Sequence, residues 1–212
     1  MAFLEAVVSG RLGRYEESRT RFEACARAHA ELGDVPAQVR CLGGVVWSLV
    51  MLGRQGESLE VAETAYELQR GDAGATGERV GEALYRVVQA LLFLGRHEEA
   101  LARCAELDSL TSETTSPYEL GRRAATKGVV FLRIGEFDRA VATLTDSVGW
   151  LEQAGTWSDV ASAQKWLGEA LERAGDVAGA RRRWTEALAT FEHHQHPFAD
   201  QVRAQLAALP GN

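Results

Sequence analysis

The sequence predicts an all-α protein, built as a solenoid of about five helical hairpins with a capping helix at its C-terminal end. Three observations predict this fold. A glycine-centred motif recurs five times at nearly constant spacing. Apolar residues on both sides of each glycine follow the spacing of a helix, and no segment alternates long enough with the period of two that is typical of a strand.

The repeated motif consists of an apolar residue, a glycine and a small residue five positions after that glycine. The five glycines are spaced by 40, 42, 40 and 40 residues: Gly13, Gly53, Gly95, Gly135 and Gly175. The small residues that follow them are Ser18, Ser58, Ala100, Ala140 and Ala180. A glycine adopts the left-handed conformation that ends a helix at low cost, and a small residue lets another helix cross closely. Each motif therefore predicts a turn between two packed helices.

The elements follow in order from this repeat. Hairpins are expected at about residues 1–34, 35–75, 76–115, 116–156 and 157–196, and the capping helix at about 198–209. Pro36, Pro117 and Pro197 lie at equivalent points, 81 and 80 residues apart. Ser116 has the character of an N-cap, and the loop Thr111–Pro117 separates two hairpins. Since no linker is long, we predict a single domain over residues 1–212.

Composition excludes several classes of function. The chain has 212 residues, 46% of them hydrophobic, and a net charge of −7, which argues against nucleic acid as a direct partner. No apolar run approaches the roughly 20 residues of a membrane span, and Met1–Gly13 does not resemble a signal peptide. Three cysteines cannot all pair, so we expect reduced thiols, a cytoplasmic location and no membrane partner. No catalytic arrangement is visible, and we expect neither an enzyme nor a cofactor.

The fifth unit resembles the tetratricopeptide repeat (TPR) family, with Leu167-Gly168 in its first helix, Gly175 at the turn and Ala180 in its second helix. Other units depart from the family pattern, since Val45-Val46 and Val87-Val88 replace the Leu-Gly pair. The period of about 40 is similar to the long repeats of kinesin light chain and of bacterial transcription regulators of the maltose-activator and Streptomyces antibiotic types. The resemblance implies a right-handed superhelical α-solenoid with a concave groove.

The resemblance also implies which side chains line the groove, because the first helix of each repeat faces it. The candidates are Arg40, Trp47, Tyr85, Arg86, Gln89, Arg122, Lys165 and Trp166. Arginine forks bind carboxylates and aromatic rings provide rigid contact area, so an acidic or C-terminal peptide segment would suit this lining. The alternative is that the arginines pair with glutamates and the tryptophans pack between repeats.

We therefore expect a non-catalytic module that binds a protein or peptide. The resemblance also suggests that the module is the sensory or regulatory part of a bacterial transcription regulator. One alternative is a receptor for a small molecule or short signalling peptide, which the near absence of asparagine (only Asn212) disfavours. Another is a self-associating scaffold or homodimer. The short first hairpin leaves Phe3, Leu4 and Val7 as candidates for its contact surface, and it also suggests a piece of a larger protein.

Other motifs are weaker candidates. The segment His193–His196 is interpreted as a solvated turn rather than a metal site, and the segment Gly71–Gly77 as a connector rather than a phosphate loop. Cys25 and Cys104 are expected in the core, whereas Cys41, beside Arg40, is expected to be the more reactive thiol. We therefore predict no metal site.

Overall fold

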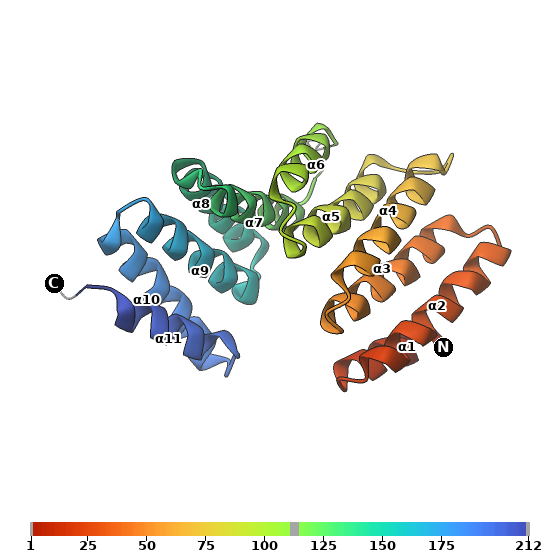
Figure 1. Cartoon of the computed structure of the whole chain (residues 1–212), viewed down its shortest axis with the longest axis horizontal. Coiled ribbons are helices and arrows are strands. Elements are labelled where there is room, and N and C mark those ends of the chain that lie inside the picture. Colours follow the sequence, from red (N-terminus) through yellow and green to blue (C-terminus); the bar gives the residue numbers. More distant parts are fainter. Residues whose placement is uncertain (1, 111–114, 211–212) are drawn as a thin grey trace. The chain divides into compact units, whose positions relative to one another are not determined.

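The structure, a computed structural model, describes residues 2–110 and 115–210, and these residues form eleven α-helices and no strand (Figure 1). The chain divides into two compact units, Met1–Ser112 and Glu113–Asn212, and the expected single domain stays a prediction. Unit 1 contains α1 (Ala2–Arg11), α2 (Tyr15–Glu31), α3 (Val35–Met51), α4 (Gln55–Gly71), α5 (Gly77–Phe93) and α6 (His97–Ser109). Unit 2 contains α7 (Pro117–Ile134), α8 (Phe137–Ala154), α9 (Trp157–Arg173), α10 (Val177–His193) and α11 (Phe198–Ala208).

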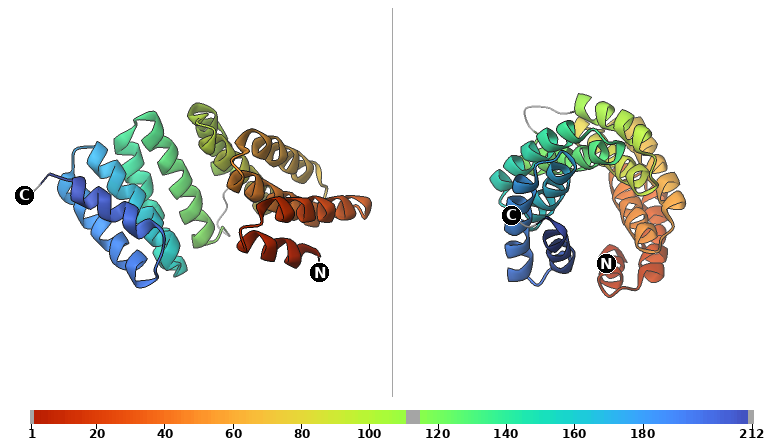
Figure 2. Two further views of the ribbon diagram at one scale, coloured as in Figure 1. Left: turned by 60° about the horizontal axis from the view of Figure 1, so that its bottom comes forward. Right: turned by 60° about the vertical axis from the view of Figure 1, so that its left-hand side comes forward.

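Within each unit every helix packs against the next helix along the chain (Figures 1 and 2). Alternate helices also touch, since α3 contacts both α1 and α5, and α7 contacts α9. The first helices of neighbouring hairpins thus form one layer in each unit, and the second helices pack on that layer. This is the all-α hairpin arrangement that the repeat predicts.

The five motif glycines adopt left-handed backbone conformations, as predicted. Their φ angles are +75° at Gly13, +73° at Gly53 and Gly95, +88° at Gly135 and +91° at Gly175. The five small residues that follow them are all fully buried: Ser18, Ser58, Ala100, Ala140 and Ala180. The Ser18 hydroxyl also donates a hydrogen bond of 2.9 Å to the Ala6 carbonyl oxygen across the first hairpin. The motif therefore specifies both the turn and the close helix crossing.

We expect Gly175→Ala to lower the free energy of unfolding by about 1–2 kcal/mol, because an L side chain is strained at a φ of +91°. Gly149→Ala is the matched control, since Gly149 lies inside α8 and its added Cβ would meet open space. That change should stabilise the chain by about 0.5–1 kcal/mol. Urea titration of the two variants measures both values, and a Gly175→Ala variant as stable as the parent would contradict the assignment.

Helix starts also follow the sequence signals. Pro36 and Pro117 lie in the first turns of α3 and α7, and Pro197 immediately precedes α11. The Ser116 hydroxyl accepts a hydrogen bond of 3.2 Å from the Glu119 backbone N–H, as an N-cap does. Residues 111–114 of the predicted loop Thr111–Pro117 lie outside the described residues.

The helix α11 covers the last hairpin of unit 2. Its Val202 is fully buried against α10, in a cluster with Trp184 and Phe191, and Leu209 just beyond the helix joins this cluster. Repeat proteins need such an element because each hairpin buries its apolar face only against its neighbours.

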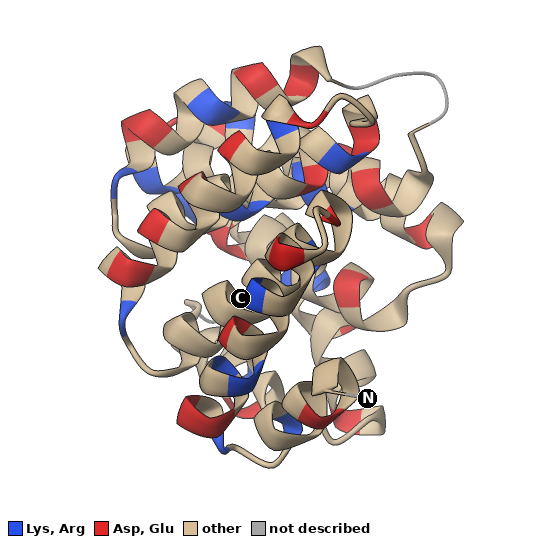
Figure 3. Cartoon of the chain, turned by 90° about the vertical axis from the view of Figure 1, so that its right-hand side faces the viewer, with Lys and Arg blue, Asp and Glu red and all other residues tan. Residues whose placement is uncertain are grey.

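Charged residues of both signs are interspersed along the helices (Figure 3). The arginine after a motif glycine pairs with a glutamate three residues later, as in Arg54–Glu57 and Arg96–Glu99, each with an N–O distance of 2.5 Å. The hydrogen bond from Arg54 lowers the pKa of the Glu57 carboxyl. These pairs are solvent-exposed, so they contribute little stability. In the described part of the chain, no helix is long and apolar enough to span a membrane.

Candidate binding pocket

A pocket of about 310 Å³ lies within unit 1, where α1, α2, α3 and α5 meet. Its lining combines aromatic, glycine and arginine residues: Phe3, Val7, Arg11, Phe22, Arg40, Gly43, Gly44, Trp47 and Arg86. Three of the predicted groove residues, Arg40, Trp47 and Arg86, are brought together here.

Aromatic rings form the apolar walls of this pocket. The rings of Phe3 and Phe22 meet edge to face with centroids 5.3 Å apart. Trp47 packs in the same manner on Tyr15 at 5.6 Å, yet 42% of Trp47 remains exposed. A large apolar ring fixed by a neighbour but open to solvent provides rigid contact area for a ligand.

Two adjacent glycines of α3 make this arrangement possible. A Cβ on Gly43 would lie 2.8 Å from Cζ of Arg86, so the guanidinium group of Arg86 rests directly on the α3 backbone. A Cβ on Gly44 would lie 2.6 Å from the Phe22 ring. The pair Gly43-Gly44 therefore lets one charged and one aromatic side chain approach α3 from opposite neighbours.

Three arginines supply positive charge around the pocket. Arg86 forms an ion pair of 2.9 Å with Glu82, one turn earlier on the same helix. Arg11 and Arg40 are exposed, and neither forms a hydrogen bond or ion pair with any residue that the structure describes. An excess of guanidinium groups beside apolar walls favours a ligand that carries a carboxylate next to an apolar group.

The other two predicted groove residues of unit 1 do not line the pocket. Tyr85 is buried, and its hydroxyl accepts a hydrogen bond of 2.9 Å from the Gln89 side-chain amide. Both residues lie on α5 close to Arg86, but their polar groups contact each other.

The other predicted groove residues, Arg122, Lys165 and Trp166, belong to unit 2. The guanidinium of Arg122 lies 5.6 Å from the centre of the Tyr118 ring. The half-buried ring of Trp166 has the ammonium of Lys165 at 3.6 Å and the guanidinium of Arg133 at 5.3 Å from its centre. Two cationic groups therefore lie close to the Trp166 ring.

The prediction that Lys165 is an accessible ligand contact is wrong. Lys165 is 1% exposed, and its ammonium also lies 5.2 Å from the Phe198 ring of α11. Burial lowers the pKa of this amine below its usual 10.5, whereas the charge of Glu169 opposes the shift. Phe198 of the capping helix therefore lies against the side chain of Lys165, which is buried.

We expect Lys165→Met to make unit 2 more stable near neutral pH. Because the folded-state pKa is lowered, the unfolded chain binds more protons than the folded chain between that value and 10.5. Burying this amine therefore costs no stability from its charge above pH 10.5, where it is neutral in both the folded and the unfolded chain. The cost appears as pH falls below 10.5 and is complete below the folded-state pKa. Urea titrations at several alkaline pH values should show the difference between variant and parent shrinking as pH rises. A variant less stable than the parent at every pH would mean that the contacts with Trp166 and Phe198 outweigh the cost of burial.

Only one of the three N-terminal apolar residues expected to form a self-association surface is mostly exposed to solvent. Phe3 and Val7 are half-buried and face the pocket and the core of unit 1, because Phe22 and Val45 pack against them. Leu4 is 68% exposed and so remains a candidate for self-association.

The expected reactivity of Cys41 is also wrong. Cys41 is 1% exposed, and burial raises the pKa of its thiol to about 12, with a further contribution from its hydrogen bond to Cys25. Cys25 and Cys104 are buried, as predicted. In the predicted solvated turn at residues 193–196, His194 stacks on Trp157 with ring centres 3.6 Å apart.

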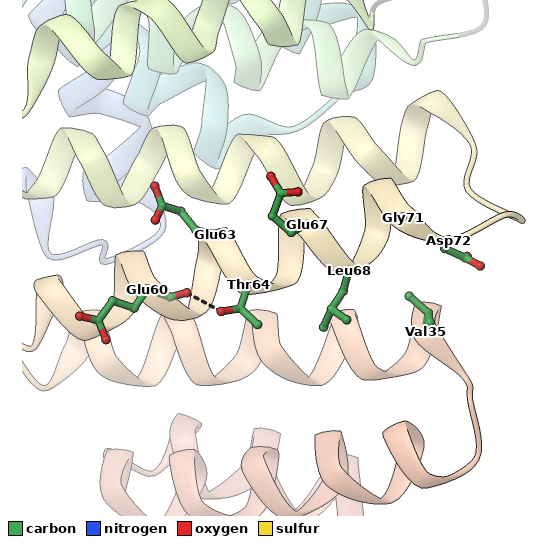
Figure 4. A pocket seen from close by; sticks show the side chains of 8 residues that line it. All are labelled: Val35, Glu60, Glu63, Thr64, Glu67, Leu68, Gly71 and Asp72. Atoms are coloured by element: carbon green, nitrogen blue, oxygen red, sulfur yellow. Dashed lines mark hydrogen bonds between the residues drawn. The ribbon is translucent and has the colours of Figure 1, made fainter.

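A larger surface hollow of about 780 Å³ follows the outer side of α4 (Figure 4). Half of its eight lining residues are acidic, with Glu60, Glu63, Glu67 and Asp72 on α4 and at its end (Figure 4). Glu67 is paired with Arg70 at 2.7 Å. This hollow lacks aromatic walls, so it is a less specific surface than the arginine pocket.

The fold is shared with solved repeat structures. No protein-family model and no curated protein matches the sequence. The kinesin light chain TPR-like repeats of Podosopora anserina match with a TM-score of 0.71 and 15% identity, covering 92% of this chain and 94% of theirs. The apo form of RapI matches with a TM-score of 0.83 and 11% identity, covering 100% and 77%. A Rap protein complexed with competence and sporulation factor matches with a TM-score of 0.68 and 14% identity, covering 98% and 62%. The chain is therefore a TPR-like repeat protein with the fold of an α-solenoid.

Proposed function

We propose that this chain is a non-catalytic binding module whose pocket in unit 1 accepts an apolar side chain of a peptide or protein segment next to a carboxylate. The observation that carries the proposal is the pair of arginines, Arg11 and Arg40, without partners among the described residues, beside an aromatic pocket that Arg86 also reaches.

The pocket suits one anchoring residue rather than a long segment. Its volume of about 310 Å³ lies at the lower end of ligand sites, enough for one or two side chains. Trp47 and Phe3 would contact the apolar group, and the guanidinium groups would bind the carboxylate. Hydrogen bonds between charged groups contribute about 1.5–3 kcal/mol each, so the arginines would provide much of the affinity.

The likeness in fold supports this class of function and a regulatory use of the site. One structural neighbour is a Rap protein in complex with competence and sporulation factor, and others are kinesin light chain repeats. By analogy, we propose a protein or peptide partner and a role as the sensory part of a regulator, with a bacterial transcription regulator as the candidate.

Fluorescence anisotropy with labelled peptides tests the proposal. A library of short peptides that carry one apolar anchor and either a free C-terminus or an internal Asp or Glu should yield binders. Amidation of the C-terminus, or Asp→Asn and Glu→Gln changes, then identifies which carboxylate is bound. Arg40→Ala should weaken binding about 10- to 100-fold. Arg27→Ala, an exposed arginine of α2 outside the pocket, is the matched control. Equal losses in both variants, or binding insensitive to every carboxylate change, would refute the site.

The small volume also favours a second candidate, a receptor for a small carboxylate or short signalling peptide. The length of the ligand distinguishes the two. If a dipeptide binds as tightly as an eight-residue peptide with the same anchor, the pocket alone is the receptor. If affinity grows with length, a longer surface takes part.

Self-association stays a prediction, and the exposed face of α1 is where it should be tested. We expect Leu4→Glu to turn any dimer into a folded monomer, because Leu4 is 68% exposed and its replacement leaves the core intact. Light scattering at tens of micromolar protein measures the mass. A parent chain that is already monomeric would remove this candidate.

A further inference from the structure

Two cysteines and a histidine of unit 1 lie close together where α2 packs on α3. One donor atom from each of Cys25, His29 and Cys41 lies within 4.8 Å of the other two. Cys25 and His29 are four residues apart on α2 and so share one helix face, while Cys41 faces them from α3. The two sulfur atoms are 3.0 Å apart.

The polar atoms of this cluster are incompletely satisfied. Nδ1 of His29 is buried and makes no hydrogen bond, although Oδ2 of Asp34 lies 3.4 Å away. The other carboxylate oxygen of Asp34 accepts the Ala37 backbone N–H at 3.1 Å, as the N-cap of α3. A buried ring nitrogen without a hydrogen bond is costly. If His29 binds an ion through Nε2, its Nδ1 carries a hydrogen, and the Asp34 carboxylate is the nearby acceptor.

We propose that Cys25, His29 and Cys41 bind a Zn²⁺ ion. Thiolate and imidazole are the ligands that zinc prefers, and three protein ligands leave one position for water. His29 and Asp34 are half exposed, so the ion has a path from solvent, while the buried cysteines form the inner wall.

The geometry needs only a local adjustment. Zinc–sulfur bonds of about 2.3 Å at tetrahedral angles place two sulfurs about 3.8 Å apart, so the thiols must separate slightly from 3.0 Å. Both thiol protons leave when the ion binds, because a coordinated thiol is deprotonated by the metal charge. The Asp34 carboxylate lies where it can orient the His29 ring, as carboxylates beside metal-bound histidines do. The ion would link the second helix of the first hairpin to the first helix of the next.

Competition between the reduced, metal-free full chain and a chromogenic zinc chelator tests the proposal. We expect one Zn²⁺ per chain, and one Co²⁺ with the visible bands of a tetrahedral thiolate site. Cys25→Ser and His29→Gln should each weaken zinc binding by at least about 10- to 100-fold. His29→Gln preserves the buried cysteines, so it reports on binding even if Cys25→Ser does not fold. Asp34→Asn keeps an N-cap residue but should weaken binding about 10-fold if the carboxylate orients the ring.

Two control variants complete the design. Cys104→Ser alters the third buried cysteine, which lies on α6 outside the cluster, and should leave zinc binding unchanged. His193→Gln/His196→Gln removes two histidines of the C-terminal turn and should also leave it unchanged. The proposal is overturned if zinc binding survives His29→Gln, if it is lost in the C-terminal variant, or if no stoichiometric binding occurs. Formation of a Cys25–Cys41 disulfide with no metal binding after reduction would overturn it as well.

Discussion

Trp184→Ala is expected to lower the free energy of unfolding of unit 2 by about 3–5 kcal/mol, the usual cost of removing a buried aromatic side chain. Trp184 is 1% exposed and lies at the centre of the cluster that joins α9, α10 and α11. Its indole N–H donates a hydrogen bond of 2.9 Å to the Lys165 carbonyl oxygen. A Cβ on Gly168 would lie 2.4 Å from the indole nitrogen, so the ring is fitted tightly against the α9 backbone. Few neighbouring side chains can collapse into the space that the ring leaves.

Urea unfolding and amide hydrogen exchange measure this effect. Exchange should accelerate most in α9 and α10, because stability in repeat proteins depends on nearest neighbours. Trp184→Phe retains most of the volume and should cost about 1–2 kcal/mol, mainly through the lost hydrogen bond. Trp150→Ala is the matched control, since Trp150 is 38% exposed, and should cost under about 1 kcal/mol. Equal losses in Trp184→Ala and Trp150→Ala would contradict the packing described above.

The hairpins could be predicted because each one is specified locally. The left-handed glycine at residue 175 and the buried Ala180 five residues later are requirements of one turn and one helix crossing. Neither depends on distant parts of the chain. Five copies of such a motif therefore predict the order of the helices without any information on tertiary contacts.

The pocket was predictable only in part, because helix register indicates which face a residue occupies but not what covers it. Arg40 and Lys165 were both assigned to the groove from their positions before a turn glycine. Arg40 is exposed, whereas Phe198 of the capping helix lies over Lys165. Arg11 was missed because it comes from the last turn of α1 rather than from a complete first helix. The adjacent Gly43-Gly44 inside a helix was the available signal, since paired glycines there mark close approach of other side chains.

The proposed zinc site could not be predicted from the sequence for a related reason. The spacing of Cys25 and His29 places both on one face of a helix, and this could be deduced from the sequence. Their approach to Cys41 depends on how α2 and α3 pack, and no local pattern specifies that distance.

Gly43→Ala is expected to weaken peptide binding about 10-fold or more without lowering the stability of the chain. The new Cβ would lie 2.8 Å from Cζ and 3.0 Å from Nε of Arg86, so the guanidinium group must leave its place on α3. A long side chain can move at little cost, and alanine is favoured over glycine inside a helix by about 0.5–1 kcal/mol. The pocket would then lose one charge-assisted hydrogen bond to the ligand, which accounts for the expected loss of affinity.

The neighbouring glycine provides the contrast that makes this result interpretable. A Cβ on Gly44 would lie 2.6 Å from the Phe22 ring, which is buried in the core and cannot swing into solvent. Gly44→Ala should therefore lower stability, whereas Gly43→Ala should lower affinity alone, and Gly56→Ala in α4, where a Cβ meets open space, should lower neither. Anisotropy with the selected peptide and urea titration of the same three variants measure both quantities. If Gly43→Ala binds as tightly as the parent, Arg86 does not contact the ligand, and Arg11 and Arg40 alone would have to hold the carboxylate.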